Sequence, residues 1–172
     1  RLALSRLLTL ASSTEQSGVI RAWLRSKDSG SLPDTPRVTR HSSPASTVVA
    51  LTGSGGVGKS TLIGKLIEVL RSKALRVAVL ACDPQSPLTR GALLGDRIRM
   101  PTRPDDDGVF VRSLAVPSGY GAIAPNLDLM IALLDTYGFD IVLVETAGAG
   151  QGDTAVHQVA DVVVLLVQPE TG

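Results

Sequence analysis

A glycine-rich stretch at residues 53–60 carries the most informative chemistry of this sequence. It reads Gly-Ser-Gly-Gly-Val-Gly-Lys-Ser and fits the pattern G-x-x-x-x-G-K-[ST] in full. Glycines let backbone N–H groups turn towards a polyphosphate without a clash from Cβ atoms. In this pattern the lysine, Lys59, reaches the β- and γ-phosphates, and the hydroxyl of Ser60 is a Mg²⁺ ligand. The stretch therefore predicts a nucleoside triphosphate site, formed by Gly53, Ser54, Gly55, Gly56, Val57, Gly58, Lys59, Ser60 and Thr61.

The sequence on either side of this loop has the pattern that such a site needs. Residues 47–52 are apolar and rich in β-branched side chains, as in a buried parallel strand. After the loop, apolar residues recur at helical spacing, which predicts a helix that begins near Lys59. The N-terminus of that helix would direct its partial positive charge at the bound phosphates.

Strand and helix patterns alternate from residue 47 onwards. Strands are predicted at 47–52, 76–82, 109–114, 140–146 and 161–167, with further helices at 123–137 and 154–160. This alternation predicts an α/β fold of the P-loop NTPase class, with a doubly wound, mainly parallel sheet and helices on both faces. Because such folds usually have more than five strands, we expect a C-terminal part that is missing beyond Gly172.

The first 46 residues have a different pattern. Apolar side chains at helical spacing predict two short helices, and a segment rich in Ser, Pro, Asp and Thr predicts a linker over 26–46. We therefore divide the chain into an N-terminal helical extension with its linker (1–46) and a P-loop domain (47–172). The helical pair is expected to pack on that domain or on another subunit.

Carboxylates follow two of the predicted strands. Asp83 comes after the second strand, and Glu145 ends the fourth. Ligands of open α/β sheets gather at the carboxyl ends of strands, where both side chains would lie beside the phosphate loop. Mg²⁺ prefers oxygen ligands, so Ser60, Asp83 and Glu145 are candidate ligands, with Asp96 of the long 83–104 loop as another.

A second glycine-rich segment follows Glu145. In Glu-Thr-Ala-Gly-Ala-Gly-Gln, residues 145–151, the N–H of Gly148 could bond a γ-phosphate, and the glycines would allow the segment to move when that phosphate leaves. Either Glu145 or Gln151 could orient the attacking water, and Lys59 would assist catalysis.

Composition excludes several classes of function. The net charge of +1 gives no overall basic field for nucleic acid or an anionic membrane, and no run approaches the roughly 18 apolar residues of a membrane span. Aromatic residues make up only 3% of the chain, so the core must be aliphatic. The single cysteine, Cys82, ends an apolar strand, which favours a packing role and is consistent with a reducing compartment.

Taken together, these segments resemble the MeaB/ArgK-type P-loop GTPases, which are associated with methylmalonyl-CoA mutase. The resemblance is carried by LTGSGGVGKST (51–61), VAVLACDPQSP (77–87), GALLGDRIRM (91–100), VFVRSLA (109–115) and DIVLVETAGAGQGDTAV (140–156). It covers nearly all of residues 47–172, and the front helices are similar in kind to the family's N-terminal extension.

The resemblance implies a GTPase whose hydrolysis of GTP to GDP is coupled to loading, protection or reactivation of an adenosylcobalamin-dependent acyl-CoA mutase. Lys59, Ser60, Asp83, Asp96 and Glu145 match the family's phosphate and Mg²⁺ positions. It further implies a homodimer in a bacterial cytoplasm, or in a mitochondrial matrix if the source is eukaryotic. The guanine-reading Asn-Lys-x-Asp is absent from this sequence, so the preference for guanine rests on the resemblance.

Three other classes of P-loop protein are alternatives to this family. Relatives named as lysine/arginine/ornithine transport kinases imply ATP and phosphoryl transfer to a transport protein. Metal-insertion GTPases usually have His or Cys clusters, whereas this chain has only His41, His157 and Cys82, far apart in sequence. ATPases of the ParA/MinD type have a lysine where this chain has Ser54, which argues against that group.

Overall fold

The computed structural model describes residues 2–13, 15–28, 46–84, 106–117, 119, 121–147 and 153–169. Its helices are α1 (Leu2–Ser12), α2 (Ser17–Asp28), α3 (Lys59–Ser72), α4 (Leu127–Thr136) and the 3₁₀ helix η1 (Asp153–Gln158). Its strands are β1 (Thr47–Gly53), β2 (Val77–Pro84), β3 (Val109–Val116), β4 (Ile141–Glu145) and β5 (Val162–Leu166).

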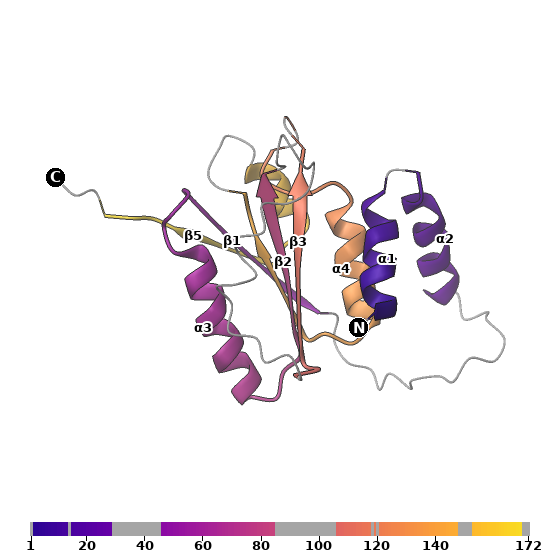
Figure 1. The fold of residues 1–172 in the computed structure, drawn as a ribbon, viewed down its shortest axis with the longest axis horizontal. Coiled ribbons are helices and arrows are strands. Elements are labelled where there is room, and N and C mark those ends of the chain that lie inside the picture. The colour runs from indigo at the N-terminus through magenta and orange to yellow at the C-terminus, as the bar shows by residue number, and fades with distance from the viewer. Residues whose placement is uncertain are drawn as a thin grey trace.

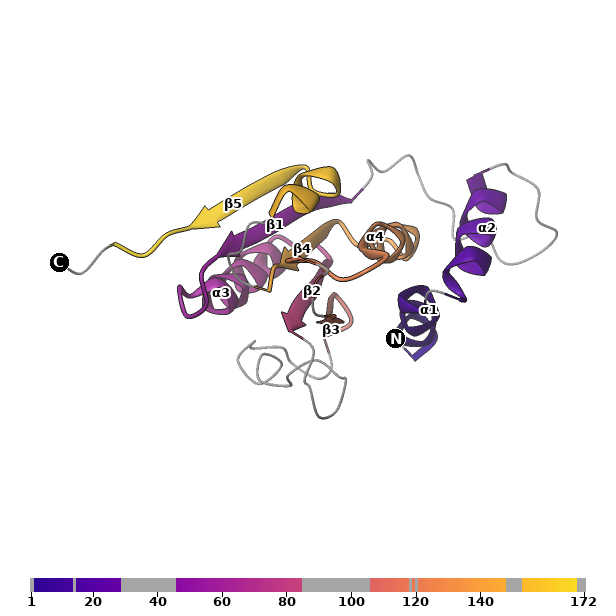
Figure 2. The same cartoon turned by 90° about the horizontal axis from the view of Figure 1, so that it is seen from above.

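The strands form one parallel sheet in the order β3-β2-β4-β1-β5. The predicted α/β fold is confirmed. β4 lies at the centre, and its last residue, Glu145, is in register with Leu51 of β1 and Ala81 of β2. The carboxyl ends of β1, β2 and β4 therefore lie next to one another. Figure 2 shows β5 along one edge of the sheet.

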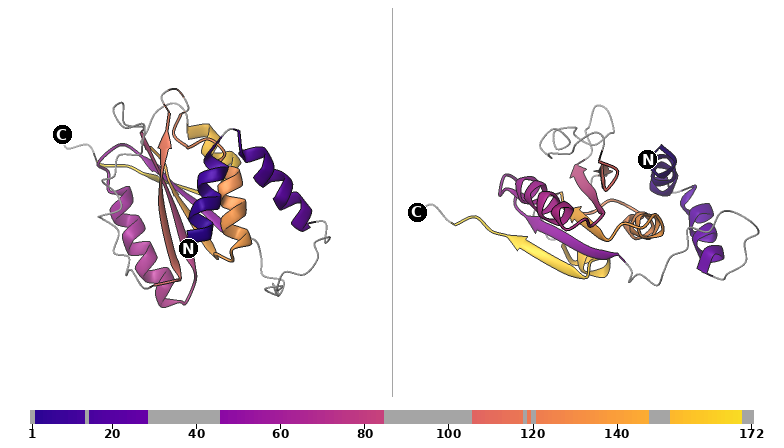
Figure 3. Two further views of the ribbon diagram at one scale, coloured as in Figure 1. Left: turned by 45° about the vertical axis from the view of Figure 1, so that its right-hand side comes forward. Right: turned by 90° about the horizontal axis from the view of Figure 1, so that it is seen from below.

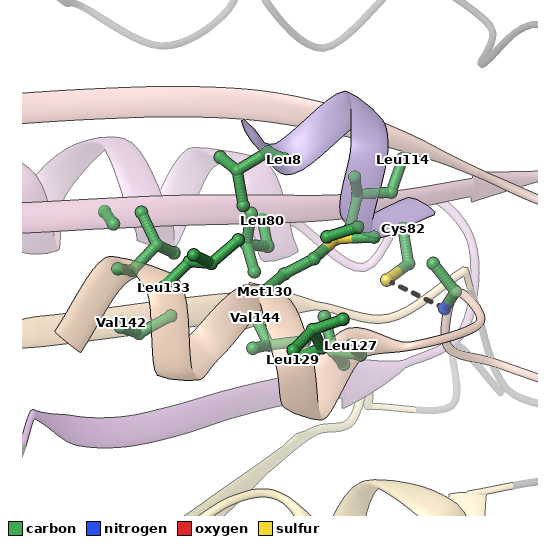
Figure 4. Packing of buried hydrophobic residues seen from close by; sticks show 14 of the residues in the cluster. Leu8, Leu80, Cys82, Leu114, Leu127, Leu129, Met130, Leu133, Val142 and Val144 are labelled. Atoms are coloured by element: carbon green, nitrogen blue, oxygen red, sulfur yellow. Dashed lines mark hydrogen bonds between the residues drawn. The ribbon is translucent and has the colours of Figure 1, made fainter. Parts of the chain in front are cut away.

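Helices cover both faces of the sheet, as predicted. Figure 1 shows α3 on one side and α4, α1 and α2 in succession on the other. On the α3 side, Ile63 and Ile67 pack against Leu51, Val79 and Leu143. The opposite side has the larger cluster, to which α4 contributes one apolar face and α1 adds Leu4, Leu8 and Ala11. Figure 4 shows Leu8 with Met130 and Leu133 of α4 in this cluster. The buried side chains of both clusters are mainly aliphatic, as the composition indicates, with Phe139 as an aromatic member.

The N-terminal helices share the core of the sheet domain. Leu8 of α1 is fully buried, and Ile20 of α2 is 5% exposed in the same cluster as the side chains of α4. The two helices are antiparallel neighbours beside α4 (Figure 3). Among the described residues, no helix is both long enough and apolar enough to cross a lipid bilayer.

Several predicted boundaries were wrong. The helix predicted from 123 begins only at Leu127, because Asn126 has a left-handed φ of 56° and Pro125 disfavours helical geometry in the residue before it. The linker predicted from 26 begins later, since α2 continues to Asp28. The predicted helix at 154–160 is a 3₁₀ turn that spans Asp153–Gln158. Local helical spacing of apolar residues does not reveal where a backbone leaves helical geometry.

Candidate nucleotide site

The glycine-rich loop joins the end of β1 to the start of α3. Gly58 has φ of 100° and occupies the N-cap position of α3, and its carbonyl accepts the N–H of Leu62 at 2.9 Å. Gly56 also has a left-handed φ, of 80°. Residues with a Cβ rarely adopt these conformations, which is the local reason for glycine at both positions. Helix α3 begins at Lys59, as the spacing of its apolar residues predicts.

Gly53 is confined by the edge strand. It is paired with Leu166 of β5, and a Cβ at this position would lie 2.4 Å from the carbonyl oxygen of Leu166. The first glycine of the loop is thus required by close approach of β5, as well as by its own φ of 141°. The packing of β5 and the course of the loop are consequently linked.

The ammonium group of Lys59 lies over the loop. Its Nζ donates to the carbonyl oxygens of Gly53 at 2.9 Å and Ser54 at 3.0 Å, and the residue is only 8% exposed. Lys59 is therefore held at the mouth of the loop and at the N-terminus of α3. A charge in this place, next to the partial positive charge of the helix, favours an anion.

Ser60 and Glu145 are joined across the site. The hydroxyl of Ser60 donates to Oε1 of Glu145 at 2.7 Å, although 85 positions separate the two residues in sequence. Glu145 is 6% exposed. The contact arises because β4 lies beside β1, so that the end of β4 faces the first turn of α3.

Asp83 lies on the same face of the sheet as Glu145. Glu145 is in register with Ala81, and Asp83 follows two residues later on β2, where side chains return to the same face. That face is the one covered by α3. Asp83 is 8% exposed. The structure therefore brings the loop, Lys59, Ser60, Asp83 and Glu145 together at the carboxyl ends of the strands.

Cys82 is excluded from the site by the alternation of side chains along β2. It belongs to the opposite core cluster (Figure 4) and accepts the N–H of Ala124 at 3.4 Å. Burial raises the pKa of its thiol to about 12, and the nearby charges of Asp83 and Glu145 contribute to the rise. The thiol is protonated at neutral pH, in agreement with a packing role.

Thr146, directly after Glu145, is a buried polar residue that the sequence analysis did not single out. It is 2% exposed, its N–H donates to the carbonyl of Leu51 at 3.1 Å, and its Oγ1 has no hydrogen-bond partner in the described part of the chain. Buried hydroxyls in folded proteins are usually hydrogen-bonded, so this one is an exception next to the site. Its position directly after Glu145 was the available signal in the sequence.

The remaining candidates lie outside the described residues: Asp96, Gly148 and Gln151. Within the described ranges, no group of three or more His, Cys, Asp or Glu side chains could hold a metal ion. A cation site here would instead combine the Ser60 hydroxyl with carboxylate oxygens of Asp83 and Glu145. This set consists only of oxygen donors, which suits Mg²⁺ together with phosphate oxygens and water.

Comparison with known proteins gives the family. Residues 35–172 match the family described as methylmalonyl-CoA mutase-associated GTPase MeaB. The chain belongs to this family. A Pyrococcus abyssi protein whose name describes it as a GTPase is 48% identical over 125 residues, which are 73% of this chain and 39% of that protein. The chain thus spans about two fifths of the length of that relative.

Two further similarities concern larger proteins. The fused isobutyryl-CoA mutase of Nocardia farcinica is 44% identical over 128 residues, which are 73% of this chain and 12% of that protein. The crystal structure of an LAO/AO transport system kinase superposes with a TM-score of 0.62 at 25% identity, over 96% of this chain and 45% of that one. The described part of this MeaB-family chain therefore shares the fold of that kinase.

Proposed function

We propose that this protein binds GTP and hydrolyses it to GDP. The proposal is carried by one observation: the phosphate loop, Lys59, Ser60, Asp83 and Glu145 meet at the ends of three neighbouring strands, with Ser60 and Glu145 in direct contact. Membership of the MeaB family supports GTP as the nucleotide.

Each residue has a proposed role. The N–H groups of Gly53–Thr61 and the Lys59 ammonium bind the phosphates, and Gly148 would add its N–H to the γ-phosphate. Ser60, Asp83 and Glu145, with Asp96, would hold Mg²⁺ directly or through water. When bound, Mg²⁺ supplies positive charge that neutralises the β- and γ-phosphate oxygens.

Orientation of the attacking water falls to Glu145 or Gln151. Glu145 is buried beside Ser60, so its carboxylate can accept a proton or a hydrogen bond from a water held at the loop. Lys59 stabilises the negative charge on the transferred phosphoryl group. Because the chemistry is displacement by water, binding and orientation by these residues provide most of the catalysis.

We further propose that this GTPase acts on an adenosylcobalamin-dependent acyl-CoA mutase and controls whether that mutase is active. The family is described as mutase-associated, and a 44% identical relative is named as a fused isobutyryl-CoA mutase. Hydrolysis would be coupled to loading, protection or reactivation of the mutase, by a homodimer of this protein. Methylmalonyl-CoA mutase is the proposed partner.

A second candidate is a P-loop kinase that acts on an amino-acid transport protein. The observation in its favour is the similarity to the LAO/AO transport system kinase. The two functions differ in the acceptor of the γ-phosphoryl group, which is water in a GTPase and a protein side chain in a kinase.

The two functions are separated by following the γ-phosphate. The intact protein is incubated with γ-labelled GTP or ATP, alone and with a cobalamin-dependent mutase, and free phosphate and labelled protein are measured. For a GTPase we expect free phosphate to be released from GTP, and to be released faster when the mutase is present. The Lys59→Ala variant should release little phosphate with or without the mutase. Label on an acceptor protein, with ATP preferred, would establish the kinase instead.

A further inference from the structure

One arginine of the N-terminal helices is hydrogen-bonded to residues at the start of α4. In α2, Arg21 donates from Nη1 to Oδ2 of Asp128 at 2.7 Å and from Nη2 to Oδ1 at 3.2 Å. Its Nη2 also donates to Oδ1 of Asn126 at 3.3 Å. The two acceptors flank the first residue of α4, and this pairing holds the pKa of Asp128 below its usual value. The left panel of Figure 3 shows α1, α2 and α4 side by side.

The segment before α4 contacts two strand ends of the nucleotide site. The carbonyl of Ala122 accepts the N–H of Ala147, two residues beyond Glu145, at 3.0 Å. The N–H of Ala124 donates to Sγ of Cys82, the neighbour of Asp83, at 3.4 Å. Ala122 and Ala124 are each 4% exposed. The 121–126 segment is therefore packed against β4 and β2 where these strands carry the candidate carboxylates.

This segment is short and conformationally restricted. Pro125 has a fixed φ, and Asn126 is held at a left-handed φ of 56° while its side chain makes no cap bond to α4. Only one residue separates Asn126 from Ala124. A shift of the α4 N-terminus must consequently move the backbone that contacts Ala147 and Cys82.

From these contacts we infer that Arg21 is a positioning residue for the nucleotide site. By its hydrogen bonds to Asn126 and Asp128, it fixes the position of the 121–126 segment. Through this segment it also positions the ends of β4 and β2. The inference rests on the proposed GTPase function for its effect on turnover. The geometric coupling from Arg21 to Ala147 does not depend on that function.

Arg112 is a control that distinguishes positioning of the nucleotide site by Arg21 from simple attachment of the N-terminal helices. This arginine of β3 also ties the N-terminal helices to the sheet domain: it donates to the Ser5 carbonyl at 2.8 Å and to Thr9 Oγ1 at 3.0 Å. Both of these acceptors belong to α1, far in sequence from Asn126 and Asp128. If Arg21 only attached the helices, loss of either arginine would have the same consequences.

The test compares Arg21→Met with Arg112→Met in the intact protein. Amide hydrogen exchange is followed at Ala124 and Ala147, and GTP turnover is measured as separate kcat and KM values. We expect Arg21→Met to speed exchange at both amides and to lower kcat by about two- to fivefold, the range typical of partly exposed ion pairs, with KM nearly unchanged. Arg112→Met should leave the exchange and kcat close to wild type, and Arg21→Lys should restore part of the loss.

Equal exchange at Ala124 and Ala147 in the two methionine variants would overturn the inference. If Arg21→Met fails to fold, Asp128→Asn removes the charged acceptor at the other side and should give the same faster exchange. Absence of GTP hydrolysis by the wild-type protein would refute the proposed function, while the exchange data would still decide the positioning role.

Discussion

Replacement of Glu145 by Gln tests the site most directly. The carboxylate accepts the Ser60 hydroxyl at 2.7 Å and is 6% exposed, at the centre of a sheet where Leu51 and Ala81 are its register partners. Glutamine keeps the size of the side chain and one acceptor oxygen, so the fold should survive. What it removes is the negative charge next to the proposed Mg²⁺ position.

The size of the effect follows from the burial of this group. A hydrogen bond to a charged partner contributes about 1.5–3 kcal/mol, and about 1.4 kcal/mol corresponds to a factor of ten. We therefore expect Glu145→Gln to lower the Mg²⁺-dependent kcat/KM for GTP by about 10- to 100-fold. Binding of a fluorescent GTP analogue in EDTA should change little, because the loop and Lys59 are retained.

The assay is steady-state GTP hydrolysis over a Mg²⁺ titration, with Asp140→Asn as the matched control. Asp140 precedes the same strand at its other end, where its Oδ2 accepts the Arg76 N–H at 2.6 Å. The control should hydrolyse GTP at the wild-type rate. Wild-type turnover and an unchanged Mg²⁺ requirement in Glu145→Gln would refute the role given to this carboxylate.

Three further predictions concern the loop, the helical extension and the cysteine. Gly53→Ala places a Cβ 2.4 Å from a carbonyl oxygen of β5, so the affinity for a fluorescent GTP analogue should fall by about tenfold or more, while Gly18→Ala, with open space around it, should bind normally. Leu8→Ala empties a fully buried position and should lower the free energy of unfolding in urea by about 2–5 kcal/mol, whereas Leu2→Ala, at an exposed position, should cost little; equal effects would contradict the packing of α1. The Cys82 thiol should resist thiol reagents at pH 8 until the protein unfolds. Because its pKa is 9.0 when unperturbed and about 12 when folded, the unfolded state releases the proton first, and stability should fall as pH rises from about 9 to 12. That fall should be smaller in Cys82→Ala, and native reactivity of the thiol would contradict its burial.

The sequence determined the local features of this protein. The glycine-rich loop, the strand before it and the helix that begins at Lys59 were all predictable, because each depends on neighbouring residues and on side-chain periodicity. The parallel α/β fold followed from the alternation of strands and helices. The sequence also indicated that Asp83 and Glu145 end strands, although it gave no order for those strands.

Strand order and long-range contacts were decided only by the tertiary structure. β4 lies between β1 and β2, and this arrangement brings Glu145 to Ser60 and places Asp83 on the same face. The ion pair of Arg21 with Asp128 joins residues 107 positions apart. Periodicity reports which face of an element is apolar and contains no information about its partner, so these contacts come from packing of the whole chain. The same limit explains the late start of α4, because the left-handed φ of Asn126 does not appear in the spacing of apolar residues.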